Sequence, residues 1–342
     1  MAGIAHGGGL SVAIAAYGGG SDEWLDLSTG INPNTPELPE IPAEIWNRLP
    51  DRGLVDAARA AARDWYFCCG SKVSSSSADV VLPLPVPGTQ SFIQILPKLV
   101  PQGRPVAILS PTYGEYAHCF RKAGLQVDAI RSVEDIRPDH GTLVLVNPNN
   151  PDGRTFSRAD LLAIHARMKA QSGHLHVDEA FGDARPELSV ARQAAEMPGL
   201  TVSRSFGKFF GMAGLRLGFV FAPAAVLETI ETELGPWAVS GPALYLATEL
   251  MRSDRTPILA AIKARRAALQ TVLTVGGLTV AGGTELFALV AHEKAAGLFE
   301  HLARAHILVR KFDYAPDWLR VGLVADEQGD RKLASALASF GS

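Results

Sequence analysis

Short apolar runs and longer amphipathic stretches alternate through the middle of the chain. The apolar runs are bounded by polar or turn-forming residues, as is typical of strands buried in a sheet. They lie at residues 80–82, 106–109, 143–146, 175–178 and 217–221. The stretches between them carry a helical pattern at residues 90–99, 116–123 and 157–170, and Ser157 with Asp160 resembles an N-terminal capping box. Strands and helices that alternate in this way predict a mainly parallel sheet with both faces covered.

The pattern changes after residue 235. Helical stretches at 242–252 and 257–274 precede an alternating segment at 286–290, a helix at 294–305 and short apolar runs at 307–309 and 318–323. This order predicts a smaller α+β domain. We expect a large domain at residues 30–235 and a small domain made of residues 1–29 and 236–342. Five prolines in the segment from Asn32 to Pro50, counting Pro50 itself, exclude a regular helix there and predict a surface connection.

Composition narrows the class of protein. The 342 residues fit two domains of roughly 150 residues each. With 32 Lys and Arg against 35 Asp and Glu, the chain offers no net basic charge for nucleic acid or an anionic membrane. No apolar run approaches the about 20 residues that span a bilayer, and no Lys or Arg precedes the first apolar residues, so we expect no signal peptide. The three cysteines, with Cys68 and Cys69 adjacent, form neither a disulfide framework nor a CxxC metal site. These features predict a cytoplasmic globular protein.

The first candidate for chemistry is Lys208, which lies in a segment rich in glycine and phenylalanine. Apolar surroundings ease deprotonation of a lysine amine, which suits Schiff-base formation. Ser205 precedes this lysine by three residues and Arg216 follows it by eight. A hydroxyl and a guanidinium at these positions could meet one phosphate group.

Polar residues also follow the predicted strands. Asp178 ends one strand, and the carboxyl ends of strands are where open α/β sheets bind ligands. Asn150 and Tyr113 follow two others and supply an amide and an aromatic face. Gly88, Thr89 and Gln90 follow a further strand and open a helix, whose free backbone N–H groups would bind an anion.

In order and type, these residues resemble the fold-type I pyridoxal-phosphate enzymes, the aspartate aminotransferase superfamily, over nearly the whole chain. The resemblance implies an α/β fold with a large mainly parallel-sheet domain and a smaller α+β domain, pyridoxal 5'-phosphate as cofactor, no metal, and a homodimer. It implies that Lys208 binds the cofactor covalently, Asp178 pairs with the pyridine nitrogen and Tyr113 stacks on the ring, these three being catalytic. It implies that Arg320 binds the substrate's α-carboxylate. The other cofactor contacts that it implies are Gly88, Thr89, Gln90, Asn150, Ser205 and Arg216.

Two positions depart from this superfamily. Many members have a tyrosine three residues after the aspartate, where this chain has Phe181. The usual Tyr-Pro-Asp segment, whose tyrosine reaches the partner's cofactor phosphate, begins here with Leu49. The loss of both hydroxyls affects the tuning expected of an aminotransferase but leaves cofactor binding as predicted.

The N-terminal region indicates which branch of this superfamily the chain resembles. His6 with the three glycines after it, and the segment from Trp24 to Pro33, resemble the threonine-phosphate decarboxylases of cobalamin synthesis. The segments at 205–211 and 48–51 resemble the CobC subgroup of these enzymes. This resemblance implies conversion of a small phosphorylated amino acid, L-threonine O-3-phosphate, to (R)-1-amino-2-propanol O-2-phosphate and CO2. Besides Arg320, the substrate contacts that we expect are His6, Gly30, Asn32 and Arg310, and Lys311 is a further guess.

Other functions remain open from the sequence. An aminotransferase acting on histidinol phosphate would share the cofactor contacts and would differ in which bond of the substrate's Cα stands perpendicular to the ring. A non-catalytic scaffold or regulator would not need the intact Lys208, Asp178 and Arg320. Ser205 and Lys208 also match a serine–lysine dyad, although its companion motifs are absent. His174, His176 and Asp178 share a strand face and could bind a metal, but the cofactor explains the aspartate better.

Overall fold

The computed structural model describes residues 7–67 and 81–340, and the chain divides into two compact units. The larger unit comprises Glu37–Asn150 and Thr155–Arg255, and the smaller comprises Met1–Pro36, Pro151–Arg154 and Thr256–Ser342. These bounds differ from the predicted ones at 30 and 235. Helix α10 (Gly241–Arg252) belongs to the larger unit because it packs along α3 (Arg52–Phe67). Residues Pro151–Arg154 join the smaller unit because the Asp152 carbonyl accepts a hydrogen bond from Gly283 N at 3.1 Å.

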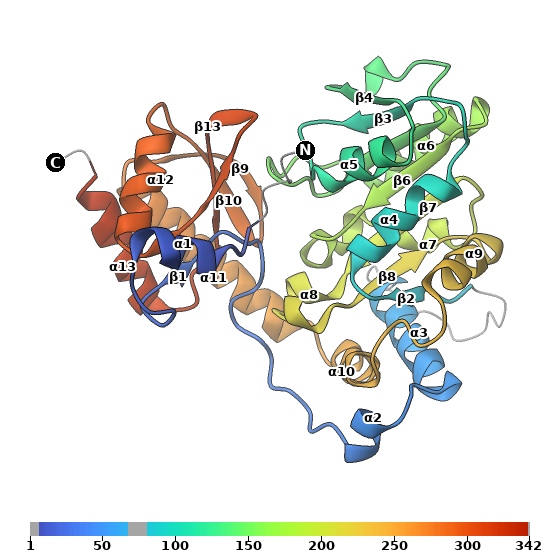
Figure 1. Cartoon of the computed structure of the whole chain (residues 1–342), viewed down its shortest axis with the longest axis horizontal. Coiled ribbons are helices and arrows are strands. Elements are labelled where there is room, and N and C mark those ends of the chain that lie inside the picture. Colours follow the sequence, from blue (N-terminus) through green and yellow to red (C-terminus); the bar gives the residue numbers. More distant parts are fainter. Residues whose placement is uncertain (1–6, 68–80, 341–342) are drawn as a thin grey trace. The chain divides into compact units, whose positions relative to one another are not determined.

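Among the described residues, the larger unit contains a seven-stranded sheet that runs from β4 at one edge to β2 at the other (Figure 1). The strands in spatial order are β2 (Leu84–Val86), β8 (Gly218–Phe221), β7 (Leu200–Ser205), β6 (His174–Asp178), β5 (Thr142–Val146), β3 (Val106–Leu109) and β4 (Val127–Ile130). Strand β8 is antiparallel to both of its neighbours, and the pairs from β7 to β4 are parallel. The predicted mainly parallel sheet is confirmed.

One strand position in the prediction was wrong. Of the predicted run at 80–82, Val81 and Leu82 lie outside the edge strand, and Val80 lies outside the described residues. The edge strand is β2, in which Pro85 pairs with Phe219. Proline lacks an N–H group and is tolerated at a sheet edge. The carbonyls of Leu82 and Pro83 instead accept hydrogen bonds from Arg59 of α3 at 3.1 Å.

Helices connect and cover these strands. They are α2 (Ala43–Asn47), α3, α4 (Thr89–Leu99), α5 (Glu115–Lys122), α6 (Arg158–Ala170), α7 (Ala191–Ala194), α8 (Phe206–Phe209), α9 (Ala224–Leu234) and α10, with short 3₁₀ turns at Val133–Asp135, Gly182–Ala184, Pro186–Leu188 and Ala213–Leu215. The capping box of Ser157 and Asp160 is present at the start of α6. Helix α2 corrects the expectation of no helix in the proline-rich segment, because its five residues fit between Pro42 and Pro50.

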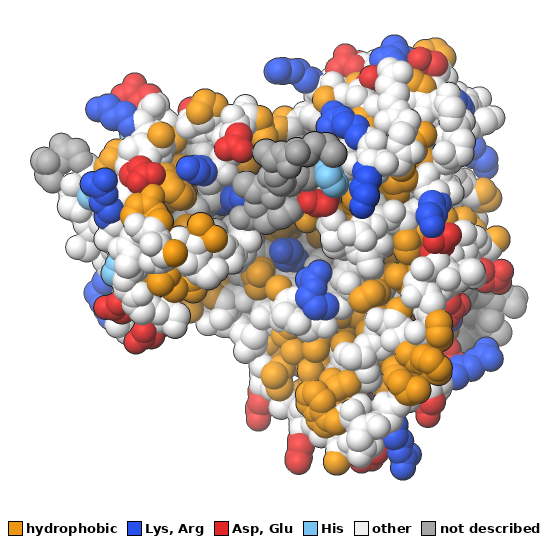
Figure 2. Space-filling view, in the orientation of Figure 1, with side chains coloured by type: hydrophobic (Ala, Val, Ile, Leu, Met, Phe, Trp, Pro, Cys, Tyr) orange, Lys and Arg blue, Asp and Glu red, His pale blue; other side chains and the backbone are white. Residues whose placement is uncertain are grey.

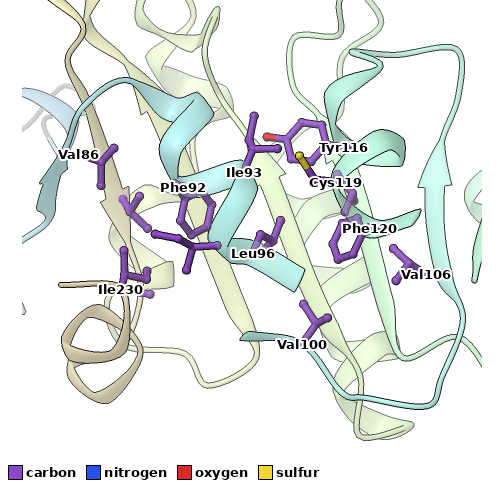
Figure 3. Packing of buried hydrophobic residues seen from close by; sticks show 14 of the residues in the cluster. Val86, Phe92, Ile93, Leu96, Val100, Val106, Tyr116, Cys119, Phe120 and Ile230 are labelled. Atoms are coloured by element: carbon purple, nitrogen blue, oxygen red, sulfur yellow. The ribbon is translucent and has the colours of Figure 1, made fainter. Parts of the chain in front are cut away.

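The core of the larger unit lies between the sheet and the helices α4, α5 and α9. Figure 3 shows Phe92, Ile93 and Leu96 of α4 packed against Ile230 on one side and Phe120 on the other. Tyr116 of α5 belongs to this cluster and is fully buried. The packing fixes α4 and α5, so the residues at their N-termini are held at the carboxyl edge of the sheet.

The smaller unit is α+β, as predicted. Its antiparallel sheet has the order β12–β13–β10–β9, and β1 pairs with β11 in parallel. The elements are α1 (Leu10–Tyr17), β1 (Leu25–Asp26), α11 (Thr256–Val275), β9 (Thr279–Thr284), β10 (Phe287–Ala291), α12 (Ala295–Arg304), β11 (Ile307–Leu308), β12 (Arg310–Phe312), β13 (Ala315–Gly322) and α13 (Glu327–Ala338). In the described part of the chain, no helix has both the length and the apolar character needed to cross a membrane.

Candidate active site

All the predicted cofactor contacts lie in the larger unit, at the ends of its strands. Asp178 is the last residue of β6, and Ser205 is the last residue of the neighbouring β7. Lys208 follows in α8, which begins directly after β7. Tyr113 lies after β3 and Asn150 after β5. Since β3, β5, β6 and β7 are parallel, their carboxyl ends lie at one edge of the sheet, where ligands bind in open α/β folds.

Asp178 is a buried carboxylate with fixed hydrogen bonds. Its Oδ2 accepts from Tyr116 Oη at 2.8 Å, and its Oδ1 accepts from Ala180 N at 2.9 Å. Burial raises the pKa of the Asp178 carboxyl, although both hydrogen bonds and the positive charge of Lys208 act in the opposite direction. A carboxylate in such a place gains from a cationic partner. Its surroundings therefore fit the protonated ring nitrogen of pyridoxal 5'-phosphate.

The Lys208 side chain is half-buried, among aromatic rings. Its Nζ lies 5.7 Å from the centroid of the Phe181 ring. Phe206 and Phe209, on either side of the lysine, are buried in the core. A Cβ added to Gly207 would lie 2.6 Å from Ala213 Cα, so the glycine allows the next loop to fold closely over α8. The lysine therefore lies on a closely packed, apolar support.

Four of the predicted phosphate contacts converge at the start of α4. Gly88, the N-cap of α4, has φ 74° and ψ 153°, and a Cβ added there would lie 2.7 Å from Arg216 Nη2. A Cβ added to Gly218 would lie 3.1 Å from Thr89 N, and Gly218 pairs in register with Ser205. The first N–H groups of a helix have no partner within the helix and bind anions. With the guanidinium beside them, they form a cradle that fits a phosphate.

Gln90 fixes the orientation of Tyr113. The Tyr113 hydroxyl donates to Gln90 Oε1 at 3.2 Å, and Gln90 Nε2 donates to Glu115 Oε2 at 2.7 Å. Burial is the main cause that raises the pKa of Tyr113 to about 12, so its hydroxyl is neutral at physiological pH. Gln90, which we predicted as a cofactor contact, therefore also acts on the aromatic side chain expected to stack on the ring.

The asparagines after β5 divide into two kinds. Asn147 Nδ2 donates to the Phe156 carbonyl at 3.1 Å, and Asn147 Oδ1 accepts from Phe156 N at 2.9 Å. The Asn149 side chain accepts from Thr112 at 2.6 Å and donates to the Pro111 carbonyl at 2.9 Å. These two tie the loop together, and Asn150 is the half-buried residue that follows them.

Sequence reasoning missed the residues behind Asp178. Tyr116 contacts both Asp178 and His176, and His176 contacts Thr201. The available signal was that Tyr116 follows Tyr113 by three residues. Tyr113 lies just before α5 and Tyr116 lies in its first turn, and their ring centroids are 6.3 Å apart. His174 and His176 share a strand face, as predicted, but Thr201 is their common hydrogen-bond partner. Within the described residues, no cluster of three or more His, Cys, Asp or Glu side chains could hold a metal.

The smaller unit places two predicted substrate contacts together. Arg310 of β12 and Arg320 of β13 are directly opposite in register. Arg320 is buried and donates to the Ser28 carbonyl at 2.7 Å. Burial, with Arg310 as the next cause, lowers the pKa of Arg320 to about 10. Two cations held this closely would be stabilised by an anion between them.

The other predicted substrate contacts lie in the N-terminal segment or beside Arg310. Gly30 and Asn32 are buried, and Asn32 Oδ1 accepts from Asn34 N at 3.0 Å. His6 lies outside the described residues. Lys311 extends from the opposite face of β12, with its Nζ 4.7 Å from the Phe299 ring centroid, so the structure places it apart from Arg310.

Comparisons with known proteins agree with this arrangement. The model of the family described as aminotransferase class I and II matches residues 24–337. Two proteins named threonine-phosphate decarboxylase are similar to the chain over 98% of both lengths, one from Sinorhizobium sp. at 56% identity and one from Pseudomonas aeruginosa at 42%. The crystal structure of histidinol-phosphate aminotransferase from Sinorhizobium meliloti, in complex with pyridoxal-5'-phosphate, has a TM-score of 0.73 at 18% identity, covering 86% of this chain and 83% of that one. The last similarity concerns the fold alone. The predicted superfamily and fold are confirmed, and the chain belongs to the aminotransferase class I and II family.

Proposed function

We propose that this protein is a pyridoxal-phosphate-dependent decarboxylase that converts L-threonine O-3-phosphate to (R)-1-amino-2-propanol O-2-phosphate and CO2, a step of cobalamin synthesis. The observation that carries this choice is the 56% identity, over nearly the full length of both chains, to a protein named threonine-phosphate decarboxylase. The site in the larger unit supports the cofactor, because it offers a buried carboxylate, a lysine and a phosphate cradle at one edge of the sheet.

Each residue of the larger unit has a part in this proposal. Pyridoxal 5'-phosphate, when bound, supplies an electron-withdrawing ring that weakens a bond at the carbon bearing the substrate's amine. Lys208 would hold the cofactor and, after CO2 leaves, donate a proton to the substrate's Cα. Asp178 would pair with the ring nitrogen, and Tyr113 would stack on the ring. Asn150 would bind the ring oxygen. The phosphate would be held by Gly88, Thr89, Ser205 and Arg216, with Gln90 beside them.

The arginines of the smaller unit would bind the anionic groups of the substrate. Arg320 would pair with the α-carboxylate, and its planar guanidinium suits a bidentate contact. Arg310, on the same face of the sheet, would bind the substrate's phosphate together with His6, Gly30 and Asn32. Two fixed anchors would set the rotation of the substrate and thereby choose which bond breaks.

We also propose that the protein is a cytoplasmic homodimer. Large apolar side chains of the larger unit are exposed, among them Leu38, Trp46, Leu49 and Trp237. Figure 2 shows hydrophobic side chains gathered on the part of this unit where Figure 1 places α2 and α10. Apolar surface of this kind favours association with a second copy. Light scattering during gel filtration should give twice the mass of the chain, and the mass of one chain would contradict this proposal.

The reaction is tested with the purified holoenzyme and L-threonine O-3-phosphate in the absence of any keto acid. We expect many turnovers of CO2 and the phosphorylated amino alcohol, and no activity in Lys208→Ala. Conversion of the cofactor to its pyridoxamine form without CO2 would instead identify an aminotransferase. Histidinol phosphate with 2-oxoglutarate would then be the first alternative pair to assay. Cofactor binding without either reaction would refute the proposed substrate but not the assignment of the cofactor site.

A further inference from the structure

A row of hydrogen-bonded side chains runs from Asp178 back through the sheet. Tyr116 Oη lies 2.8 Å from Asp178 Oδ2 and 3.0 Å from His176 Nε2. His176 Nδ1 lies 2.9 Å from Thr201 Oγ1, and this hydroxyl lies 3.0 Å from His174 Nε2. All five side chains are buried. We propose that this row, called here the Asp178 relay, is a set of positioning residues that holds the Asp178 carboxylate ionised and oriented for the ring nitrogen.

The number of available protons fixes the direction of the relay. An ionised carboxylate only accepts hydrogen bonds, so the single proton of Tyr116 goes to Asp178. At 3.0 Å, the tyrosine oxygen then accepts from His176 Nε2, which carries the proton of a neutral imidazole. Burial raises the pKa of Tyr116, and a hydrogen bond from Ser203 lowers this pKa in part. Its Nδ1 accepts from Thr201, whose oxygen in turn accepts from His174 Nε2–H. Every donor in the row thus points toward Asp178.

The pKa shifts of the two histidines agree with the neutral rings that this assignment needs. Burial lowers the pKa of His174 to about 4 and that of His176 to about 3, so both rings are neutral at pH 7. Ser203 Oγ also lies 3.4 Å from His176 Nε2, but this contact is longer than the one to Tyr116. Hydrogen bonds that point one way polarise each other, so Tyr116 becomes a stronger donor than an isolated tyrosine.

The relay acts together with the positive charge of Lys208, which also lowers the pKa of Asp178. Burial disfavours the charged form of Asp178, and the side chain that bonds it directly is the neutral Tyr116. The carboxylate is thus held by a dipole that does not neutralise it, which leaves its charge for a cation. The inference rests on the proposed cofactor site but not on the substrate or on the type of reaction.

The first test needs no cofactor and no variant. Ring ¹H–¹⁵N correlations of the apoprotein at pH 7 should show His176 and His174 as neutral rings protonated at Nε2. Resonances are assigned by comparison with His174→Gln and His176→Gln. A His176 ring that is cationic, or is protonated at Nδ1, would overturn the proposed direction of the relay.

The second test uses Tyr116→Phe with Tyr66→Phe as a matched control. Tyr66 is equally buried, but its hydroxyl has no hydrogen-bond partner among the described residues. Dissociation constants are measured for pyridoxal 5'-phosphate and for an analogue in which C–H replaces the ring nitrogen. We expect Tyr116→Phe to weaken binding of the cofactor about tenfold to a hundredfold, since a hydrogen bond to a charged group is lost. Binding of the analogue should change less than twofold.

Thermal unfolding of the apoproteins of Tyr116→Phe and Tyr66→Phe shows whether a loss of affinity reflects a less stable fold or a misplaced Asp178. If Tyr116→Phe weakens cofactor and analogue equally, its role is structural and the proposal fails. If it binds the cofactor as well as Tyr66→Phe does, the relay has no role in cofactor binding and the proposal also fails. A failure of decarboxylation alone, with these dissociation constants as expected, would count against the proposed function and not against the relay.

Discussion

Replacing Gly88 with alanine should remove the phosphate cradle while leaving the fold intact. Two effects follow from the structure. The backbone at φ 74° and ψ 153° is a conformation that glycine alone adopts easily, and a Cβ there costs about 1–3 kcal/mol of stability. The added Cβ would also lie 2.7 Å from Arg216 Nη2 and 3.2 Å from its Cζ. Because the guanidinium is the end of a flexible side chain, it would move aside rather than block folding.

Backbone strain at position 88 and displacement of Arg216 should appear in different measurements. Backbone strain lowers the free energy of unfolding of the apoprotein. Displacement of Arg216 removes a charge-assisted contact worth about 1.5–3 kcal/mol, which corresponds to roughly 10- to 150-fold weaker binding of pyridoxal 5'-phosphate. Gly103→Ala is the matched control, since Gly103 also has φ 74° but an added Cβ would have no atom within 4 Å.

Equilibrium dialysis gives the dissociation constant of the cofactor, and urea unfolding gives the stability of each apoprotein. Gly103→Ala should lose stability and keep the affinity for the cofactor. Gly88→Ala should lose both, and Arg216→Ala should lose affinity with little change in stability. If Gly88→Ala bound the cofactor as tightly as Gly103→Ala, the geometry would not describe a phosphate site and the reasoning would be refuted.

Three further predictions concern other parts of the molecule. Arg310→Gln should raise the KM for the phosphorylated substrate tenfold or more, whereas Lys311→Gln, on the opposite face of β12, should change it less than twofold in steady-state assays. Arg204→Met should lower the free energy of unfolding in urea by about 3–5 kcal/mol, because it leaves two buried carboxylates without their cation. Unfolded histidine binds a proton near pH 6.5, but His174 and His176 stay neutral in the fold to about pH 4 and 3. Stability should therefore fall below pH 6.5 by up to about 1.4 kcal/mol per pH unit for each, and His176→Gln should reduce this slope in urea titrations.

Most of the strands that the sequence predicted are apolar runs, and two that it missed, β7 and β4, contain polar residues. Strand β7 contains Thr201, Ser203 and Arg204, all buried. Their burial is stable because Thr201 bonds to the two histidines and Arg204 lies 3.1 Å from Glu179. Strand β4 lies at the sheet edge and is half-exposed. The hydrophobic pattern of one segment cannot show that its polar side chains are buried, because their hydrogen-bond and ion-pair partners lie elsewhere in the sequence.

The sequence predicted those residues of the candidate site whose type and position near a strand end are enough to suggest a role. Lys208 and Asp178 are such residues, because β6 and β7 are neighbours and place them at one edge. The close approach of Arg216 to Gly88 could not be predicted, since it depends on the turn at Ala213–Leu215 and on a positive φ of 55° at Arg216. The role of Tyr116 was missed for a similar reason, because helix α5 had first to be packed against β6.

Asp178 and Glu179 are adjacent buried carboxylates that have different kinds of partner. Burial raises the pKa of both Asp178 and Glu179. Glu179 has a permanent cation, Arg204, at 3.1 Å, and it also accepts hydrogen bonds from Ser189 and from the Val190 backbone. Asp178 is instead hydrogen-bonded by neutral groups, the Tyr116 hydroxyl and a backbone N–H. Of two buried carboxylates, the one whose hydrogen-bond partners are neutral gains more from a cationic ligand. That asymmetry supports the proposal that Asp178, and not Glu179, pairs with the cofactor.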